Sequence, residues 1–365
     1  MTGQNRFFAA TYAQARNKFL RAASDAGLAV QSHIHPLLGS QSETLAMDVV
    51  RDGPADAQAL LVISSACHGV EGYAGSAVQV ALLRDASWRA RVADSGAAVL
   101  YIHALNPHGF SWTRRVTEHN VDLNRNFQDF SRALPLNAAY DEVAQLLLPS
   151  GWPPDAAVQA QIQNWIAKHG VSSWHAAVAS GQYRHPAGLF FGGSQPSWSN
   201  LTLRRVLREQ AGRCARLGWM DIHTGLGPTA QGERIHLDRD DRASLARAQD
   251  WWGQAVTSCH DGSSSSPPIT GLLWSAIREE CSQAQYTGIA LEFGTVPATQ
   301  VLQALRADHW LHAQATRPDA RTAQPITQAL REAFEVDSKS WRHAVIEQAR
   351  EAALQGLAGL ELVRK

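Results

Sequence analysis

Four short runs of apolar residues constrain the fold of this chain more than any other feature. They span residues 59–66, 97–105, 217–222 and 287–293, and none of them alternates cleanly between apolar and polar side chains. A strand covered on one face alternates, whereas a strand covered on both faces is apolar throughout. The runs therefore predict buried strands of a sheet that carries helices on both faces.

Stretches with helical spacing lie between these runs. The sequence predicts helices over residues 75–83, 140–148, 157–169, 201–216 and 242–258. Strands that alternate with helices are typical of parallel strands joined by helical crossovers. We therefore expect an α/β protein, a three-layer α/β/α sandwich with a mostly parallel central sheet.

The apolar runs are spread through most of the 365 residues, which favours a single domain over residues 1–365. Residues from about 128 to 180 are rich in Ala, Gln and Trp and contain a cluster of helix breakers at 149–154, so they are predicted to be a helical insertion. The tail over residues 321–365 has one apolar face. We expect helices there that pack on the sheet.

Charge and composition exclude several functions. The chain has 33 basic and 33 acidic residues, so a nucleic acid or an anionic membrane is not an expected partner. No apolar run approaches a membrane span, and the N-terminal residues lack the unbroken apolar stretch of a signal peptide, so we expect a soluble, cytoplasmic protein. The four cysteines form no CxxC pair, which indicates reduced, structural cysteines. The sequence leaves the oligomeric state open.

Polar residues that can do chemistry lie at or near the ends of the apolar runs. His68 and Glu71 follow the first run, His223 follows the third, and Glu292 lies inside the fourth. Because ligands bind outside the carboxyl ends of parallel strands, we expect these residues to lie close together. Two histidines and one carboxylate are a common ligand set of catalytic zinc. His68, Glu71 and His223 are therefore the predicted metal ligands, and Zn²⁺ is the predicted cofactor.

Glu292 stands between Leu291 and Phe293, where an unpaired carboxylate is costly to bury. Hydrolysis at a metal needs a group that takes a proton and donors that stabilise an oxyanion, and we assign these roles to Glu292 and an arginine. Ordinary explanations exist as well. In one explanation, Glu292 pairs with a structural arginine. In another, residues 122–125 are the capped start of a helix. The hypothesis depends on all these residues occurring together.

The order of these residues resembles the zinc carboxypeptidase superfamily. Its members carry an HxxE pair, an arginine, an Asn-Arg dipeptide, a later histidine and a final glutamate, in the order seen here. Residues 106–110 (NPHGF) are similar to the family's NPDG turn, and residues 121–127 read VDLNRNF, as in bacterial members. The chain as a whole looks most like a bacterial subgroup catalogued as a domain of unknown function.

The resemblance implies roles for individual residues. Asn124 and Arg125 would hold a free carboxylate of the substrate, because a guanidinium beside an amide recognises a carboxylate in an oriented way. Arg115, nine residues before Asn124, would polarise the scissile carbonyl, with Arg114 as the alternative. Glu292 would act as general base and then as general acid. The implied activity is zinc-dependent hydrolysis of an amide bond next to a free carboxylate, in a peptide or an acyl amino acid.

Two departures from the superfamily pattern leave alternatives open. Ninety-seven residues separate Arg125 from His223, and the insertion within this stretch is expected to roof the cleft. The superfamily's substrate-closing tyrosine has no counterpart before Glu292, and Tyr183 is the candidate to replace it. The alternatives are an N-acyl amino acid deacylase of the aspartoacylase type and a metal-bearing binding protein without catalytic activity.

Overall fold

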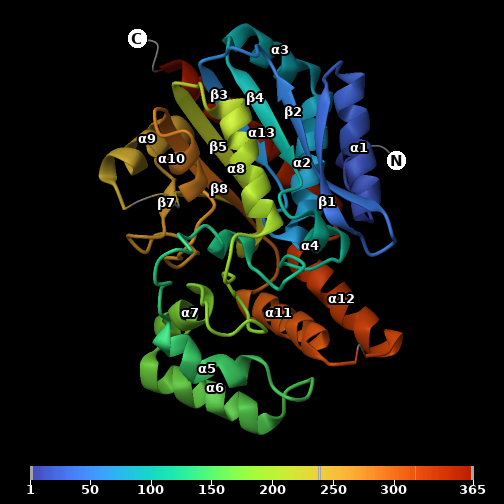
Figure 1. The fold of residues 1–365 in the computed structure, drawn as a ribbon, viewed down its shortest axis with the longest axis vertical. Coiled ribbons are helices and arrows are strands. Elements are labelled where there is room, and N and C mark those ends of the chain that lie inside the picture. Colours follow the sequence, from blue (N-terminus) through green and yellow to red (C-terminus); the bar gives the residue numbers. More distant parts are fainter. Residues whose placement is uncertain (1–2, 237, 239, 317, 363–365) are drawn as a thin grey trace.

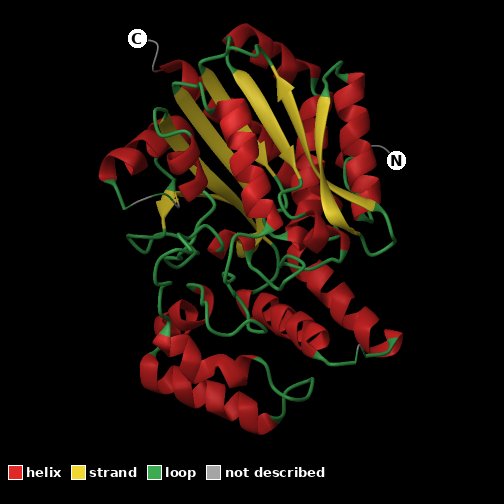
Figure 2. Cartoon of the chain, viewed as in Figure 1, coloured by secondary structure: helices red, strands yellow, loops and turns green. Residues whose placement is uncertain are grey.

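The computed structural model describes residues 3–362 apart from 237, 239 and 317. An eight-stranded sheet forms the centre of the molecule (Figures 1 and 2). The central strands β4, β3, β5 and β8 run parallel, whereas β1, β2 and β6 each pair with a neighbour in antiparallel orientation. In spatial order the strands are β1 (Val30–Leu38), β2 (Thr44–Asp52), β4 (Ala98–His103), β3 (Ala59–Ser64), β5 (Arg216–Thr229), β8 (Gln285–Gly294), β6 (Gly232–His236) and β7 (Thr257–Ser258).

The four predicted apolar runs form the four central strands, which are neighbours in the sheet. Every residue of β3 and of β4 is buried, as expected for strands covered on both faces. The predicted α/β fold is thus confirmed. The outer strands were not predicted, because their sequences mix polar and apolar residues; β1, at the edge of the sheet, is exposed at most of its positions.

Helices cover both faces of the sheet. One face packs against α1, α2, α3, α9 and α13, which share an apolar cluster with the central strands. The opposite face packs against α8 and α10. Their bounds are α1 (Tyr12–Asp25), α2 (Gly72–Arg84), α3 (Ala86–Ser95), α8 (Trp198–Ala211), α9 (Arg242–Trp252), α10 (Ser275–Glu280) and α13 (Lys339–Leu362); the short elements are η1 (Gln4–Arg6), η2 (Gly69–Glu71), α4 (Pro107–Ser111) and η3 (Leu123–Arg125).

Two predicted helices end earlier than their spacing indicates. The helix predicted over residues 201–216 ends at Ala211, because the backbone N–H groups of Ala215 and Arg216 donate to the carbonyl of Gln58 and draw this segment into the sheet. The helix predicted over residues 242–258 ends at Trp252. Gly253 follows with a φ of 93°, a left-handed backbone that stops a helix.

The segment over residues 128–180 contains three helices, α5 (Ala138–Leu147), α6 (Ala156–His169) and α7 (Val171–Ala179). With α11 (Ala298–Ala313) they lie beyond the carboxyl ends of the parallel strands (Figure 1). Trp174 and Val178 of α7 share an apolar cluster with Val301 and Leu305 of α11. This helical group therefore faces the edge of the sheet at which ligands are expected to bind.

The described part of the C-terminal tail contains two helices. Helix α12 (Ala320–Phe334) packs against α11, and α13 packs on the sheet. Residues 363–365 of the predicted tail lie outside the described residues. Helix α13 packs on β5 and β3, whereas α12 contacts the sheet at its last residue, where the carbonyl of Phe334 accepts from the hydroxyl of Thr224 on β5.

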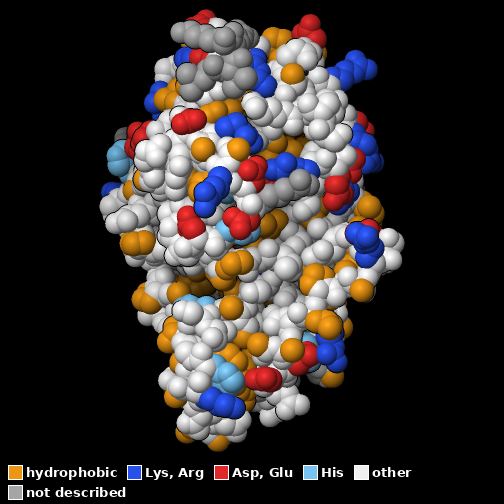
Figure 3. All heavy atoms as spheres, turned by 90° about the vertical axis from the view of Figure 1, so that its left-hand side faces the viewer, with side chains coloured by type: hydrophobic (Ala, Val, Ile, Leu, Met, Phe, Trp, Pro, Cys, Tyr) orange, Lys and Arg blue, Asp and Glu red, His pale blue; other side chains and the backbone are white. Residues whose placement is uncertain are grey.

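In the part of the chain that the structure describes, no helix is long and apolar enough to cross a membrane. On the face shown in Figure 3, basic and acidic side chains are interspersed rather than gathered by sign. The described residues of that face thus form no patch of a single charge of the kind that attracts phosphate backbones.

Candidate metal centre and active site

The predicted site residues come from three neighbouring strands and the loops that follow them. His68 follows β3, and Glu71 ends η2 directly after it. His223 lies on β5 and Glu292 on β8, where the parallel register places these two residues opposite each other. The sheet therefore brings together residues that are more than two hundred positions apart in the sequence.

His68, Glu71 and His223 form one compact cluster. The Nδ1 atom of His68 lies 2.8 Å from Oε1 of Glu71, and the Nδ1 atom of His223 lies 2.8 Å from Oε2 of the same carboxylate. The candidate ligand atoms all lie within 4.8 Å of one another, and the three residues are at most 4% exposed. The arrangement is consistent with a metal site built from two imidazoles and a carboxylate.

Two aspartates hold the outer nitrogen atoms of the imidazoles. Nε2 of His68 lies 3.2 Å from Oδ1 of Asp122, and Nε2 of His223 lies 2.6 Å from Oδ2 of Asp221. A carboxylate at Nε2 holds the proton there and leaves the lone pair of Nδ1 for a metal ion. The donor set thus fits a divalent ion such as zinc at the two Nδ1 atoms and Glu71.

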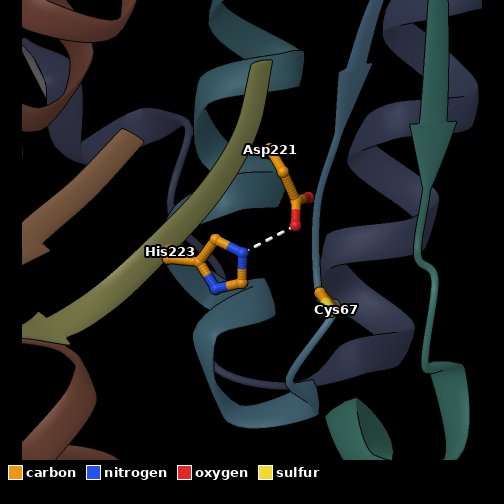
Figure 4. A group of neighbouring side chains, drawn as sticks. All are labelled: Cys67, Asp221 and His223. Carbon is orange, nitrogen blue, oxygen red and sulfur yellow. Dashed lines mark hydrogen bonds and ion pairs between the residues drawn. The ribbon is translucent and has the colours of Figure 1, made fainter. Parts of the chain in front are cut away.

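Asp221 and His223 also group with Cys67 (Figure 4). Burial and the nearby carboxylate of Asp221 raise the pKa of the Cys67 thiol well above its ordinary value. Because the thiolate rather than the thiol binds metal ions, this group is a weaker candidate than the cluster around Glu71. In Figure 4 the dashed line joins Asp221 to His223, which is the contact that orients the ring.

Glu71 and Glu292 are both buried carboxyl groups, yet their pKa values move in opposite directions. Burial alone would raise the pKa of Glu71, but the imidazoles of His68 and His223 hold it below its ordinary value. Burial, together with the negative charge of Glu71, raises the pKa of Glu292 to about 8. One oxygen of Glu292 accepts a hydrogen bond from the backbone N–H of Leu226 at 3.1 Å. Opposite shifts of two neighbouring carboxyl groups are typical of acid–base sites.

Arg115 and Arg114 line different cavities. The guanidinium of Arg115 lines the cavity of the cluster and contacts Asp122 (2.9 Å), Glu71 (3.2 Å) and His68 (2.7 Å). Arg114 pairs with Asp308 at 3.0 Å and lines another cavity. Of the two arginines, Arg115 therefore lies beside the cluster.

Asn124 and Arg125 line the same cavity and are both 3% exposed. Arg125 donates from Nε and Nη2 to the carbonyl of Ala179, the last residue of α7, and from Nη1 to the carbonyl of Asn124. These bonds use three of the five N–H groups of a guanidinium, and Nη1 also lies 4.0 Å from Oδ1 of Asp122. The other two N–H groups have no hydrogen bond within the described residues and could serve a ligand. The side-chain oxygen of Asn124 accepts from the backbone N–H of Leu273, which leaves its NH₂ group.

The cavity has a volume of about 390 Å³ and lies between the ends of the strands and the helices α6, α7 and α11. Tyr183 is not among the described residues that line this cavity. Its hydroxyl donates to the carbonyl of Arg125 at 2.7 Å and accepts from the amide of Gln128. In this structure Tyr183 supports the backbone beneath Arg125 rather than facing the cavity.

Sequence reasoning did not predict the two aspartates as site residues. Asp221 had a readable signal, because side chains two residues apart on a strand point to the same face, and His223 follows it by two. Asp122 was interpreted only as a helix cap, and it does cap η3 by accepting from the N–H of Asn124. Its contacts with His68 and Arg115 depend on the tertiary fold, for which the sequence carries no local signal.

The chain combines an α/β sheet with a His-Glu-His cluster at the carboxyl ends of its parallel strands. Residues 8–348 match the family described as "Protein of unknown function (DUF2817)", and the chain belongs to that family. No protein with a curated description matches the sequence.

A comparison with solved structures found several matches along most of the chain. The crystal structure of thrombin activatable fibrinolysis inhibitor is 10% identical, covers 96% of this chain and 74% of its own, and has a TM-score of 0.51. Carboxypeptidase A from Helicoverpa armigera is 12% identical over 94% of this chain and 73% of its own, with a TM-score of 0.44. A metallo-carboxypeptidase from Burkholderia cenocepacia is 10% identical over 96% of this chain and 69% of its own, with a TM-score of 0.45. At 10% identity, the likeness to thrombin activatable fibrinolysis inhibitor shows a shared fold.

Proposed function

We propose that the chain is a zinc-dependent hydrolase that cleaves an amide bond next to a free carboxylate. One observation carries the proposal: a buried cluster of two imidazoles and a carboxylate shares a cavity with a second carboxyl group, Glu292, whose pKa is raised to about 8. A binding site alone requires the cluster but has no use for a carboxyl group in that position.

His68, Glu71 and His223 are the residues that would hold the ion. When bound, zinc supplies a Lewis acid that polarises a carbonyl and makes water easier to deprotonate. Burial and the negative charge of Glu71 raise the pKa of Glu292, and a divalent ion held beside Glu71 would lower it toward the carboxylate form that a base needs. Glu292 then accepts a proton from the attacking water and returns it to the leaving amine.

Arg115 is the residue assigned to the scissile carbonyl. In the metal-holding tautomer, Nε2 of His68 donates its proton to Asp122 and can no longer accept from Arg115. The Nη2 group of Arg115 is then available to the oxygen on which negative charge develops. Asp122 keeps the guanidinium in place through Nε, at 2.9 Å.

Asn124 and Arg125 are assigned to the free carboxylate of the substrate. Two N–H groups of Arg125 remain after its bonds to backbone carbonyls, and a guanidinium binds carboxylates in an oriented way. Because those bonds fix the side chain before the substrate arrives, little conformational entropy is lost on binding.

A deacylase of N-acyl amino acids of the aspartoacylase type is the second candidate. The observation in its favour is that no tyrosine is among the described residues of the cavity lining. The test incubates the zinc-loaded chain with short peptides and with acylated amino acids and identifies the released products. Release from either class supports a hydrolase and names the candidate, whereas no release from both classes by a zinc-loaded protein contradicts the proposal.

A further inference from the structure

The cavity has two chemically different ends. The metal cluster, Glu292 and the two arginines form one end, and apolar side chains of the helical insertion form the other. Resting on the function proposed above, we propose that the substrate is a small molecule with a large apolar group beside its scissile amide bond. That group lies against the insertion wall, which comprises Ile166 of α6 and Val171, Trp174 and Val178 of α7.

The insertion wall is held in a fixed position. Trp174 and Val178 are 5% and 3% exposed and pack in one cluster with Val301 and Leu305, which line the same cavity from α11. Val171 stands at the start of α7 and is 57% exposed, so it borders the opening to solvent. Val171 and the half-buried Ile166 still expose apolar surface, and a substrate that covers them removes this surface from water at sites already ordered by the fold.

The wall is joined directly to the residues proposed to hold the substrate carboxylate. The carbonyl of Ala179, at the end of α7, accepts two hydrogen bonds from Arg125. The ring of Phe190, another lining residue, lies 5.3 Å from the guanidinium carbon of Arg115 and 5.6 Å from that of Arg125. We expect an apolar group close to the scissile bond to reach the wall while the carboxylate stays at Arg125.

The rest of the described lining offers few partners for a charged substrate group. Outside the groups already assigned to the metal, the proton transfer, the carbonyl and the carboxylate, His175 is the single ionisable residue among the described lining residues. A buried charge without a partner is strongly disfavoured, so a Lys, Arg, Asp or Glu side chain of the substrate would bind poorly here.

The size of the cavity limits the substrate as well. A volume of about 390 Å³ lies near the lower end of the range of small-molecule sites, about 300–1,000 Å³. The helices α6, α7 and α11 border this volume on the side away from the sheet. We therefore expect substrates of one or two residues, or an acylated amino acid, rather than folded proteins.

The test measures kcat/KM of the zinc-loaded full chain on two substrate series. In one series the acyl group of N-acyl-alanine grows from acetyl to hexanoyl to decanoyl. In the other, the residue that carries the free carboxylate in acetyl dipeptides changes from alanine to leucine, phenylalanine, glutamate and lysine. We expect kcat/KM to rise at least about tenfold with apolar size in one series, which identifies the side of the bond that meets the wall. A flat response in both series, or a preference for glutamate or lysine, overturns the proposal.

A pair of neighbouring variants locates the effect. Val171→Asp places a charge on the wall, whereas Ser172→Asp places the same charge one residue along α7, at an exposed residue outside the described lining. The ratio of kcat/KM for the largest apolar substrate to that for the smallest should fall about tenfold in Val171→Asp and stay within about twofold in Ser172→Asp. Equal ratios in the two variants contradict the assignment of the wall.

Binding separates this inference from the proposed function. Calorimetry on the zinc-loaded Glu292→Gln variant compares decanoyl-alanine with acetyl-alanine. The apolar site is supported if the decanoyl compound binds more tightly and this advantage is lost when Val171→Asp is added. If the unmodified chain then turns over no substrate, the same result contradicts the hydrolase. Turnover without any apolar preference supports the hydrolase and contradicts the apolar site.

Discussion

The two ends of the cavity are built in different ways. At the strand ends, His68, Glu71 and His223 are buried within hydrogen-bonding distance of one another, and Glu292 of β8 shares their cavity. At the insertion wall, aliphatic and aromatic side chains pack by shape. The comparison teaches that chemistry and selectivity are separable here: changes at the strand ends should abolish turnover, and changes at the wall should redirect it.

Removal of a metal ligand should have the largest effect. In His223→Ala the cluster loses an imidazole, and the aspartate that held it is left without its partner. We expect kcat/KM to fall by about 10⁴-fold or more, because the ion supplies most of the polarisation of the carbonyl. His343→Ala, at an exposed position on α13, is the control and should keep its activity. Comparable activity in the two variants would mean that the cluster is not the reaction centre.

Glu292→Gln should break the chemistry while the ion stays bound. The amide retains the size of the side chain but cannot accept the proton of the attacking water. The expected loss in kcat is about 10³-fold, within the range of general acid–base catalysis, with unchanged zinc content. Steady-state kinetics and metal analysis of the same sample check both statements. Full turnover in this variant would remove Glu292 from the mechanism.

The aspartates behind the imidazoles should show an intermediate effect. Asp221→Asn and Asp122→Asn leave the three ligands present but weaken the control over their tautomers. Zinc affinity should fall about 10- to 100-fold in each variant, as measured by competition with a chromophoric chelator. An unchanged affinity in both variants would indicate that the aspartates serve the fold alone.

The smallest effect concerns stability and its dependence on pH. The pKa of Glu292 is about 8 in the folded protein against an ordinary value of 4.5, so between these pH values the folded state binds the extra proton. Stability from this group is therefore lost as the pH rises through that window. In metal-free protein, Glu292→Gln should raise Tm by about 2–4 °C at pH 8 and change it little at pH 5.

An exposed glutamate supplies the control for this comparison. Glu351 is 61% exposed in its side chain, and Glu351→Gln should give a Tm difference that does not grow between pH 5 and pH 8. Thermal melts of both variants and the unmodified chain between pH 5 and pH 8 measure how each Tm difference depends on pH. A Glu292→Gln effect that is constant with pH would contradict a raised carboxyl pKa.

The sequence alone predicted the central strands and the proximity of His68, Glu71 and His223, and it did so for a physical reason. Strands covered on both faces have a distinctive apolar composition, and the residues that follow parallel strands must meet at one edge. The pairing of His223 with Glu292 in adjacent strands follows from that rule.

The outer strands and the residues around the cluster depend on contacts between segments that are distant in the sequence. The strands β1 and β2 pair with each other across an edge that has no continuous apolar run. Asp122 reaches both His68 and Arg115, and Ala179 reaches Arg125, only after the chain has folded. A helical pattern predicted the insertion, but not which of its side chains line the cavity.

Zinc binding to the metal-free chain tests the central claim most directly. Equilibrium dialysis against zinc should load one ion per chain in the unmodified protein, and the double variant Glu71→Ala, His223→Ala should load none, although its circular dichroism is unchanged. Retention of the same ion by the double variant, or failure of the folded unmodified chain to bind zinc, would contradict the account.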